Sequence, residues 1–109
     1  MIRHRTLNGL VGTSGGLYAA TSENGILVLR PGPVREILFA VPELNMISPG
    51  AVVAHRDMPC FGTYDGSVVC ESSEGWKKAT IGEFPVTALA SDGDRLFAWS
   101  GGRLLEVES

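Results

Sequence analysis

The sequence contains an internal repeat, and this repeat constrains the fold more than any other feature. Three segments share one order of features: a short apolar strand, a polar loop, a small-aromatic core, a glycine turn and a second apolar strand. These segments are Leu10–Leu29, Val52–Ser72 and Ala88–Ser109. One more strand is expected after each of the first two, at Val34–Phe39 and at Trp76–Ile81. Since a fixed period marks stacked structural units, the repeat predicts units of four strands.

The length of the repeat predicts a β-propeller. The aromatic core residue recurs at Tyr18, Phe61 and Phe97, so the repeat is about 36 to 43 residues long. We expect these three aromatic residues to occupy equivalent core positions. Four antiparallel strands in about 40 to 50 residues form one propeller blade. The 14 glycines lie between short apolar runs, which favours an all-β chain with many tight turns. A small sandwich or barrel with the same strand spacing is the alternative.

One segment resembles a known repeat family. Phe61–Ala79, FGTYDGSVVCESSEGWKKA, is similar to repeats of the bacterial neuraminidase (Asp-box) type, in which an S-x-D-x-G-x-x-W corner follows a glycine turn. Ser72 to Trp76 occupy that corner, with Glu74 where the family has Asp and a shortened approach to the tryptophan. LYAATSENGILVL, at 17–29, also resembles blades of bacterial sensor-type propellers. The resemblance implies a propeller fold but no particular activity, because such repeats occur in hydrolases, lectins and scaffolds.

The chain is expected to form a single half-propeller domain over residues 1–109. Blade one covers about 10–40, blade two about 51–82 and blade three about 86–109. Propellers close a ring of about 4 to 8 blades, so an arc of three blades exposes an apolar face at each end. Two copies related by a two-fold axis would close a six-bladed ring, which predicts a homodimer. A piece of a longer propeller is the alternative.

Residues 1–7 are expected to supply a strand to a partner chain. Blade three ends after its third strand, whereas residues 1–7 are basic and polar like the fourth strand of blade two. We expect residues 2–6 to complete the last blade of the partner, with Arg3 facing Glu108 and Arg5 facing Glu106. Such pairs contribute about 0.2–1 kcal/mol each and help to fix the register. A disordered basic tail is the alternative.

Composition excludes several classes of function. The net charge is −3 and the pI is about 5.3, so a general basic surface for nucleic acid is absent. No run of about 18 apolar residues is present, and the N-terminal residues lack the apolar region of a signal peptide. We therefore expect a cytoplasmic protein with neither a membrane span nor a nucleic-acid partner.

The two cysteines, Cys60 and Cys70, flank an expected turn. A two-residue turn at Asp65 and Gly66 would turn Cys60 away from Cys70, whereas a three-residue loop would place the cysteines opposite each other. We expect free, buried thiols, because a free cysteine behaves as a small core residue.

Candidate catalytic and metal-binding residues are few. His4 lies in the expected exchange strand, and His55 opens an expected polar loop at 55–59 with no Ser or Cys nucleophile at a motif position. Asp92 and Asp94 have the wrong order for a calcium loop, so we expect a turn in which Gly93 takes a positive φ. The cysteines and histidines lack zinc-ligand spacing. No catalytic residue, cofactor or metal is predicted.

The candidate ligand-binding face follows from the propeller resemblance. Propeller ligands usually sit on the loops from strand four to strand one and from strand two to strand three. The expected residues in these loops are Glu43, Asn45, Met46, Glu23, Asn24, Tyr64, Asp65, Phe84 and Trp99. This set is acidic and contains Tyr, Trp and Met, which suits a protein or carbohydrate ligand better than a phosphorylated one. The expected function is a noncatalytic binding module. The alternatives are a hydrolase or lactonase with a metal in the central channel, and a fragment of a larger sensor propeller.

Overall fold

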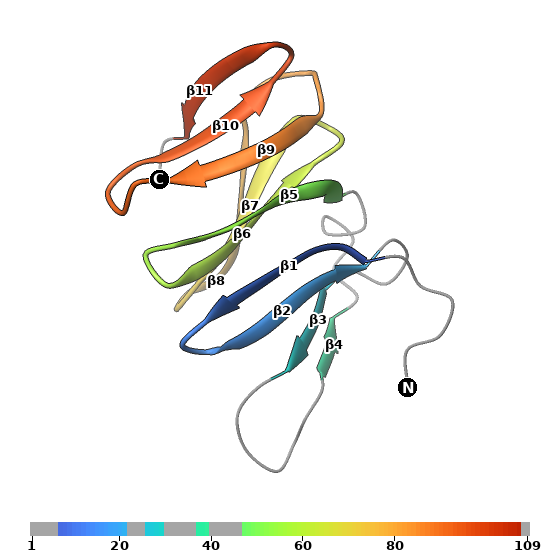
Figure 1. Cartoon of the computed structure of the whole chain (residues 1–109), viewed down its shortest axis with the longest axis vertical. Coiled ribbons are helices and arrows are strands. Elements are labelled where there is room, and N and C mark those ends of the chain that lie inside the picture. The colour runs from blue at the N-terminus through green and yellow to red at the C-terminus, as the bar shows by residue number, and fades with distance from the viewer. Residues whose placement is uncertain (1–6, 22–25, 30–36, 40–46, 108–109) are drawn as a thin grey trace.

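The computed structural model describes residues 7–21, 26–29, 37–39 and 47–107 (Figure 1). These residues form eleven β-strands in three antiparallel sheets, so the expected all-β class is confirmed. In the same residues no helix has the length and apolar character that a membrane crossing requires.

Each sheet is a meander whose strands follow one another in sequence order. The first sheet consists of β1 (Leu7–Thr13), β2 (Gly16–Thr21), β3 (Ile26–Leu29) and β4 (Ile37–Phe39). The second sheet consists of β5 (Ile47–His55), β6 (Met58–Thr63), β7 (Ser67–Ser72) and β8 (Gly75–Thr80). The third sheet consists of β9 (Val86–Ser91), β10 (Leu96–Ser100) and β11 (Arg103–Val107).

Several strand boundaries differ from those expected. Leu7 belongs to β1, and not to a separate N-terminal strand, while residues 1–6 lie outside the described residues. β5 begins at Ile47, ahead of the start expected near residue 51. β4 and β8 lie within one residue of, or inside, the two expected fourth strands. Sequence patterns locate the strands well and their ends poorly, as is usual for such predictions.

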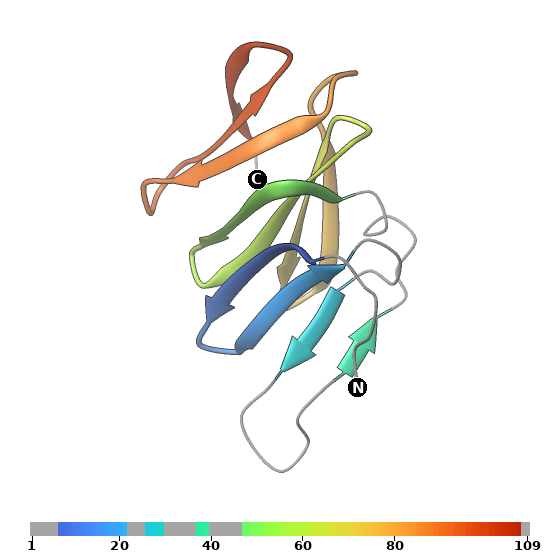
Figure 2. The ribbon, with the colours of Figure 1, turned by 45° about the vertical axis from the view of Figure 1, so that its right-hand side comes forward.

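The second sheet lies between the other two along the long axis of the molecule (Figures 1 and 2). The first strands of the three sheets, β1, β5 and β9, run side by side. Two glycines allow the sheets to approach closely. A Cβ atom on Gly9 would collide with the side chain of Val52 on β5. A Cβ atom on Gly62 would lie 2.5 Å from Cγ1 of Val86 on β9.

Two apolar clusters fill the two junctions between the sheets. The first cluster joins the first and second sheets and contains Tyr18, Ala20, Ile26, Val28, Phe61 and Val69. The second cluster joins the second and third sheets and contains Cys60, Val68, Val86, Leu96, Ala98 and Val107. Neighbouring residues Cys60 and Phe61 belong to different clusters, because successive side chains of a strand point to opposite faces. The second sheet is therefore apolar on both faces.

The three repeat aromatics do not occupy equivalent positions, which corrects the sequence alignment. Tyr18 and Phe61 share the first cluster, so they face each other across one junction. Phe97 lies between Leu96 and Ala98, which face the second sheet, so Phe97 points to the opposite side and is only half-buried. Tyr18 also points away from the side on which a preceding sheet would lie, so Phe97 corresponds to Tyr18, and Phe61 is out of phase with both by one residue. Sheets with two apolar faces give no alternation that would reveal this slip.

The length of the turn between β6 and β7 determines whether Cys60 and Cys70 lie opposite each other. Cys60 pairs with Cys70 and Gly62 with Val68, which leaves residues 64–66 as a three-residue loop. The two cysteines are therefore direct cross-strand neighbours, with Cα atoms 4.1 Å apart, and they form a disulfide. The expectation of free thiols is wrong, because the length of the hairpin loop sets the register of the strands beside it.

Candidate functional site

Three turns meet at one edge of the second and third sheets. The backbone N–H groups of Ile81 and Gly82 donate to the carbonyl oxygen of Gly66, at 2.8 Å and 3.3 Å. The hydroxyl of Ser100 donates to the carbonyl oxygen of Phe84, at 2.9 Å. These bonds join the β6–β7 turn, the β8–β9 connection and the β10–β11 turn. We call residues 64–66, 82–85 and 99–102 the aromatic edge.

The aromatic edge exposes three large aromatic side chains. Tyr64 is 46% exposed, Phe84 is 61% exposed and Trp99 is 47% exposed. The Phe84 ring packs against the backbone of Gly101, where a Cβ atom would lie 2.7 Å from Cδ2 of the ring. Gly101 has a φ of +60°, which further favours glycine at this position. Exposed aromatic side chains on well-fixed turns are typical of recognition surfaces.

One carboxylate of the edge is held in place by its neighbours. The hydroxyl of Thr63 donates to Asp65, and Nζ of Lys78 lies 3.0 Å from Oδ2 of Asp65. The hydrogen bond from Thr63 and then the contact with Lys78 lower the pKa of Asp65 from its ordinary value of 3.8. Asp65 therefore carries a negative charge near neutral pH, and Lys78 partly balances that charge.

The structure brings together four of the nine residues expected on the ligand-binding face. Tyr64, Asp65, Phe84 and Trp99 all lie on the aromatic edge. The other five, Glu23, Asn24, Glu43, Asn45 and Met46, lie outside the described residues. Whether the four contact a ligand stays a prediction.

Sequence reasoning missed Leu104, which extends the apolar surface of the edge. Leu104 is 64% exposed and pairs with Trp99 across β10 and β11. Directly paired residues share one face of a sheet, and Phe97, two residues from Trp99, lies on that face too. The guanidinium of Arg95 lies 5.2 Å from the centroid of the Phe97 ring. Strand alternation in β11 could have indicated Leu104 once the turn was known.

The opposite edge carries a turn that connects all three sheets. Arg56 and Asp57 form the β5–β6 turn, with φ angles of 50° and 61°. Asp57 accepts hydrogen bonds from the backbone N–H of Ser14, at 2.8 Å, and from its hydroxyl. Arg56 donates to the carbonyl oxygen of Asp94, at 2.6 Å, and to that of Gly93. The hydrogen bonds from Ser14 lower the pKa of Asp57.

His55 does not lie in a polar loop, which corrects the sequence expectation. It is the last residue of β5, it is 4% exposed, and its Nδ1 atom lies 2.6 Å from Oγ of Ser91. The Ser91 oxygen also accepts a hydrogen bond from the backbone N–H of Gly93. Since Ser91 is also engaged in the β9–β10 turn, the His55–Ser91 pair joins the second and third sheets.

The Asp92 segment forms the expected turn. Gly93 has a φ of +100°, and Oδ1 of Asp92 accepts hydrogen bonds from the backbone N–H groups of Asp94, at 3.0 Å, and Arg95, at 2.7 Å. The bond from Arg95 is the main cause that lowers the pKa of Asp92. Within the described ranges, no group of three or more His, Cys, Asp or Glu side chains is placed to hold a metal ion.

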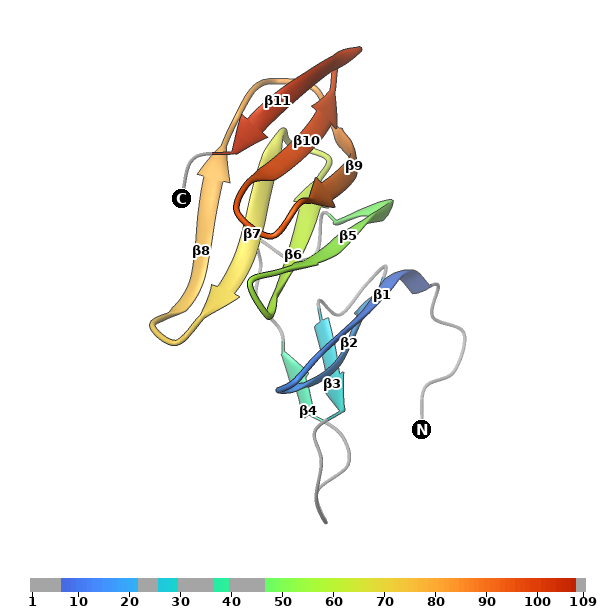
Figure 3. The same ribbon diagram turned by 60° about the vertical axis from the view of Figure 1, so that its left-hand side comes forward.

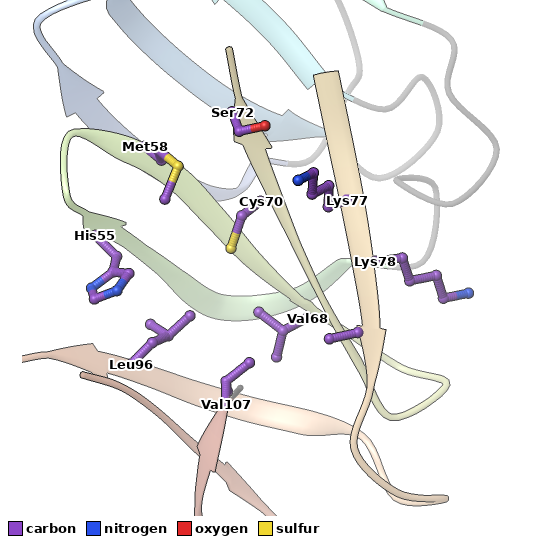
Figure 4. A pocket seen from close by; sticks show the side chains of 10 residues that line it. His55, Met58, Val68, Cys70, Ser72, Lys77, Lys78, Leu96 and Val107 are labelled. Carbon is purple, nitrogen blue, oxygen red and sulfur yellow. The ribbon is translucent and has the colours of Figure 1, made fainter. Parts of the chain in front are cut away.

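A cavity of about 330 Å³ lies between the second and third sheets (Figure 4). Its apolar lining comes from Met58, Val68, Cys70, Ala79, Leu96 and Val107. Figure 4 shows Val68, Cys70, Leu96 and Val107 turned toward this common space. His55, Ser72, Lys77 and Lys78 complete the lining. β8 and β11, the edge strands of the second and third sheets (Figure 3), both contribute to the lining, through Lys77, Lys78, Ala79 and Val107.

Comparisons with known proteins support the fold. No protein-family model matches the sequence, and no curated protein matches it. The chain is similar to BBS1N in the crystal structure of BBS1N in complex with ARL6DN, soaked with lead, with a TM-score of 0.67 and 15% sequence identity. The match covers 95% of this chain and 34% of that chain, so this chain spans about a third of the length of its neighbour. BBS1N contains a β-propeller, and the likeness shows that this chain has a propeller-like all-β fold.

Proposed function

We propose that the chain is a noncatalytic binding module for a protein ligand, with the three sheets serving as propeller blades. The observation that carries this proposal is the aromatic edge, where Tyr64, Phe84 and Trp99 are exposed on or beside hydrogen-bonded turns. Aromatic residues are enriched at protein interfaces and often dominate the binding energy. The structural neighbour BBS1N was solved in complex with ARL6DN, which is consistent with a propeller that binds a protein.

Site-specific photo-crosslinking tests the binding proposal. A photoreactive amino acid at Tyr64, Phe84 or Trp99 should capture the same protein from the native source. The matched control is Glu74, which is also exposed but lies on the β7–β8 turn, at the far end of β7 from the aromatic edge. Capture of one protein at the three edge positions and not at Glu74 supports the proposal. Equal capture at all four positions, or none at the edge, would contradict it.

The module is further proposed to assemble as a homodimer that closes a six-bladed ring. The outer face of the first sheet exposes Leu10 at 56% and Leu17 at 37%. The outer face of the third sheet exposes Leu104 at 64%, while Trp99 lies at the turn end of that face, on the aromatic edge. Apolar clusters cover the corresponding inner faces. Joining the two end faces of one copy to those of a second would cover all of this surface, as a closed symmetric assembly requires.

Light scattering at micromolar concentration tests the dimer. The expected mass is about twice the chain mass of 11.6 kDa. Leu104→Glu and Leu17→Glu should each shift the mass toward that of one chain, because each places a charge in an apolar contact. A monomeric wild-type chain would contradict the ring.

The cellular location stays a proposal. A cytoplasmic location is the expectation from sequence, whereas the Cys60–Cys70 disulfide is typical of oxidising compartments. We favour an oxidising setting for the folded form that the structure shows. Mass spectrometry of the protein from its native source, after alkylation without reduction, should leave both cysteines unmodified. Alkylation of both would favour the cytoplasm.

A further inference from the structure

The cavity between the second and third sheets lies beside a free strand edge. β11 is the last strand of the third sheet, and within residues 7–21, 26–29, 37–39 and 47–107 no strand pairs with its outer side. Val107 on β11 is part of the cavity lining, and so are Val68 and Ala79 of the second sheet. The apolar hollow and the unpaired edge are therefore parts of one feature.

In the first junction, a fourth strand supplies a large apolar side chain at the corresponding place. The pocket of about 310 Å³ at the rim of that junction has a more polar lining, which includes Ser14, Asp57 and Glu71. Trp76 on β8 packs against the first cluster, and its ring centroid lies 6.0 Å from that of Phe61. β8 is the fourth strand of the second sheet. The third sheet has three strands in the described part of the chain. In that part, the second junction therefore has no fourth-strand side chain that corresponds to Trp76.

Strand pairing shows how the two sheets correspond. Phe61 and Ala98 each lie two residues before the end of their strand, and each faces the preceding sheet. Their cross-strand partners are Val69 and Leu105, which are therefore equivalent.

The same correspondence locates the missing side chain. Two residues beyond Val69 and Leu105 are Glu71 and Val107, and Trp76 pairs with Glu71. A side chain equivalent to Trp76 would therefore lie opposite Val107, next to the cavity.

We propose that residues 2–6 of a second copy pair antiparallel with β11, and that the side chain of Ile2 occupies this cavity. The proposal rests on the dimer proposed above and names the contact that would complete it. Residues 2–6 match the five residues of β11 in length. With Ile2 opposite Val107, Ile2 and His4 face the second sheet, whereas Arg3 and Arg5 face outward.

This register is compatible with the charges on β11. Arg3 would lie opposite Glu106, which is exposed on the outward face of β11. The pairing of Arg5 with Glu106, expected from sequence alone, is thereby shifted by two residues without a change of face. The partner is a second copy because β1, which begins at Leu7, belongs to the first sheet, and the second sheet separates it from β11 (Figure 1).

Paired cysteine variants of the full chain test the register. In Arg3→Cys/Glu106→Cys, mild oxidation should give a covalent dimer on a non-reducing gel, because direct cross-strand neighbours are close enough for a disulfide. Arg5→Cys/Glu106→Cys is the matched control, with the same residue types two positions along, and should link much less. Preferential linking of the control would overturn the placement of Ile2 in the cavity. Linking within one chain would overturn the second copy as occupant.

A second variant tests the cavity contact without engineered thiols. Ile2→Asp should raise the dissociation constant of the dimer by about tenfold or more, because it places a carboxylate in an apolar cavity. Thr80→Asp is the control, since Thr80 is exposed on β8 and outside the cavity lining, and it should change the constant little. A dimer that both aspartate variants leave intact, with no linking in either cysteine pair, would refute strand exchange and leave the ring proposal standing. A monomeric wild-type chain would instead remove the ring proposal.

Discussion

The two junctions of this molecule are built from the same kind of sheet but are closed to different degrees. The junction between the first and second sheets contains Tyr18, Phe61 and Trp76, and the Tyr18 hydroxyl donates to Oε1 of Glu71 at 2.7 Å. The junction between the second and third sheets contains smaller residues around Cys60 and Val86, and it retains the apolar cavity.

The difference shows what the fourth strand contributes to a propeller-like unit. The inner strands bring neighbouring sheets together, with Gly9 and Gly62 allowing the close approach. The outer strand can add a large side chain to the junction, as Trp76 on β8 does by packing against the first cluster. A three-stranded sheet can therefore dock on its neighbour through its inner strands and still leave an unfilled outer space.

The largest expected effect is at the closed junction. Phe61→Ala should lower the free energy of unfolding by about 3–5 kcal/mol, because the side chain is fully buried among residues of both sheets. Leu96→Ala, at the wall of the open cavity, should cost nearer to 2 kcal/mol, since Leu96 already borders empty space. Urea denaturation of both variants measures the difference. Equal losses would mean that the two junctions are packed alike.

Removal of the disulfide should have the next largest effect. Cys60→Ala/Cys70→Ala should lower the free energy of unfolding by about 2–3 kcal/mol, because the cross-link closes a short loop in the unfolded chain. The loss should fall on the second junction, because both cysteines pack there. Hydrogen exchange should then rise in β10 and β11 more than in β2 and β3. A uniform rise would show that the disulfide stabilises the chain as a whole.

A methyl group added at a glycine should lower the free energy of unfolding more where two sheets approach closely than where space is available. Gly62→Ala should cost about 1–3 kcal/mol, because the new Cβ would meet Cγ1 of Val86 at 2.5 Å and Cβ of Ala51 at 2.9 Å. Gly12→Ala is the matched control, since its Cβ would meet only Cδ1 of Leu17, at 4.0 Å. Thermal melting of the two variants tests the contrast. A stable Gly62→Ala protein would show that β6 and β9 can separate at little cost.

The smallest expected effect concerns the turn that connects the sheets. Asp57 has a lowered pKa in the folded chain, caused by the hydrogen bonds from Ser14. The stabilisation is therefore present above the ordinary pKa of 3.8 and is lost as the pH falls through the lower folded value. In Ser14→Ala, the acid side of the stability profile should be flatter than in the wild type. Thr87→Ala, which removes a hydroxyl at an exposed position, should leave the profile unchanged.

Much of the architecture followed from the repeat, and the errors were errors of register. The all-β class, the meanders and the turns at Asp65, Gly93 and Gly101 agree with the sequence expectations. The state of Cys60 and Cys70 did not, because it depends on one residue in the length of a loop. The burial of His55 was missed for a related reason: its partner Ser91 comes from a different sheet.

The candidate site was also predicted only in part from the sequence. The sequence indicated which turns would share an edge, and Tyr64, Phe84 and Trp99 do lie on joined turns. It did not indicate Leu104, whose exposure depends on its pairing with Trp99.

The sequence by itself determined the local elements of this protein, because strand patterns and glycine turns are set by residues close together in the chain. Only the tertiary structure decided which face of each strand meets which neighbour. In a sheet with two apolar faces, no alternation of polar and apolar residues indicates which side chains point to which face, so the packing between sheets determines it. The same packing left the cavity beside β11, which no local pattern in the sequence could show.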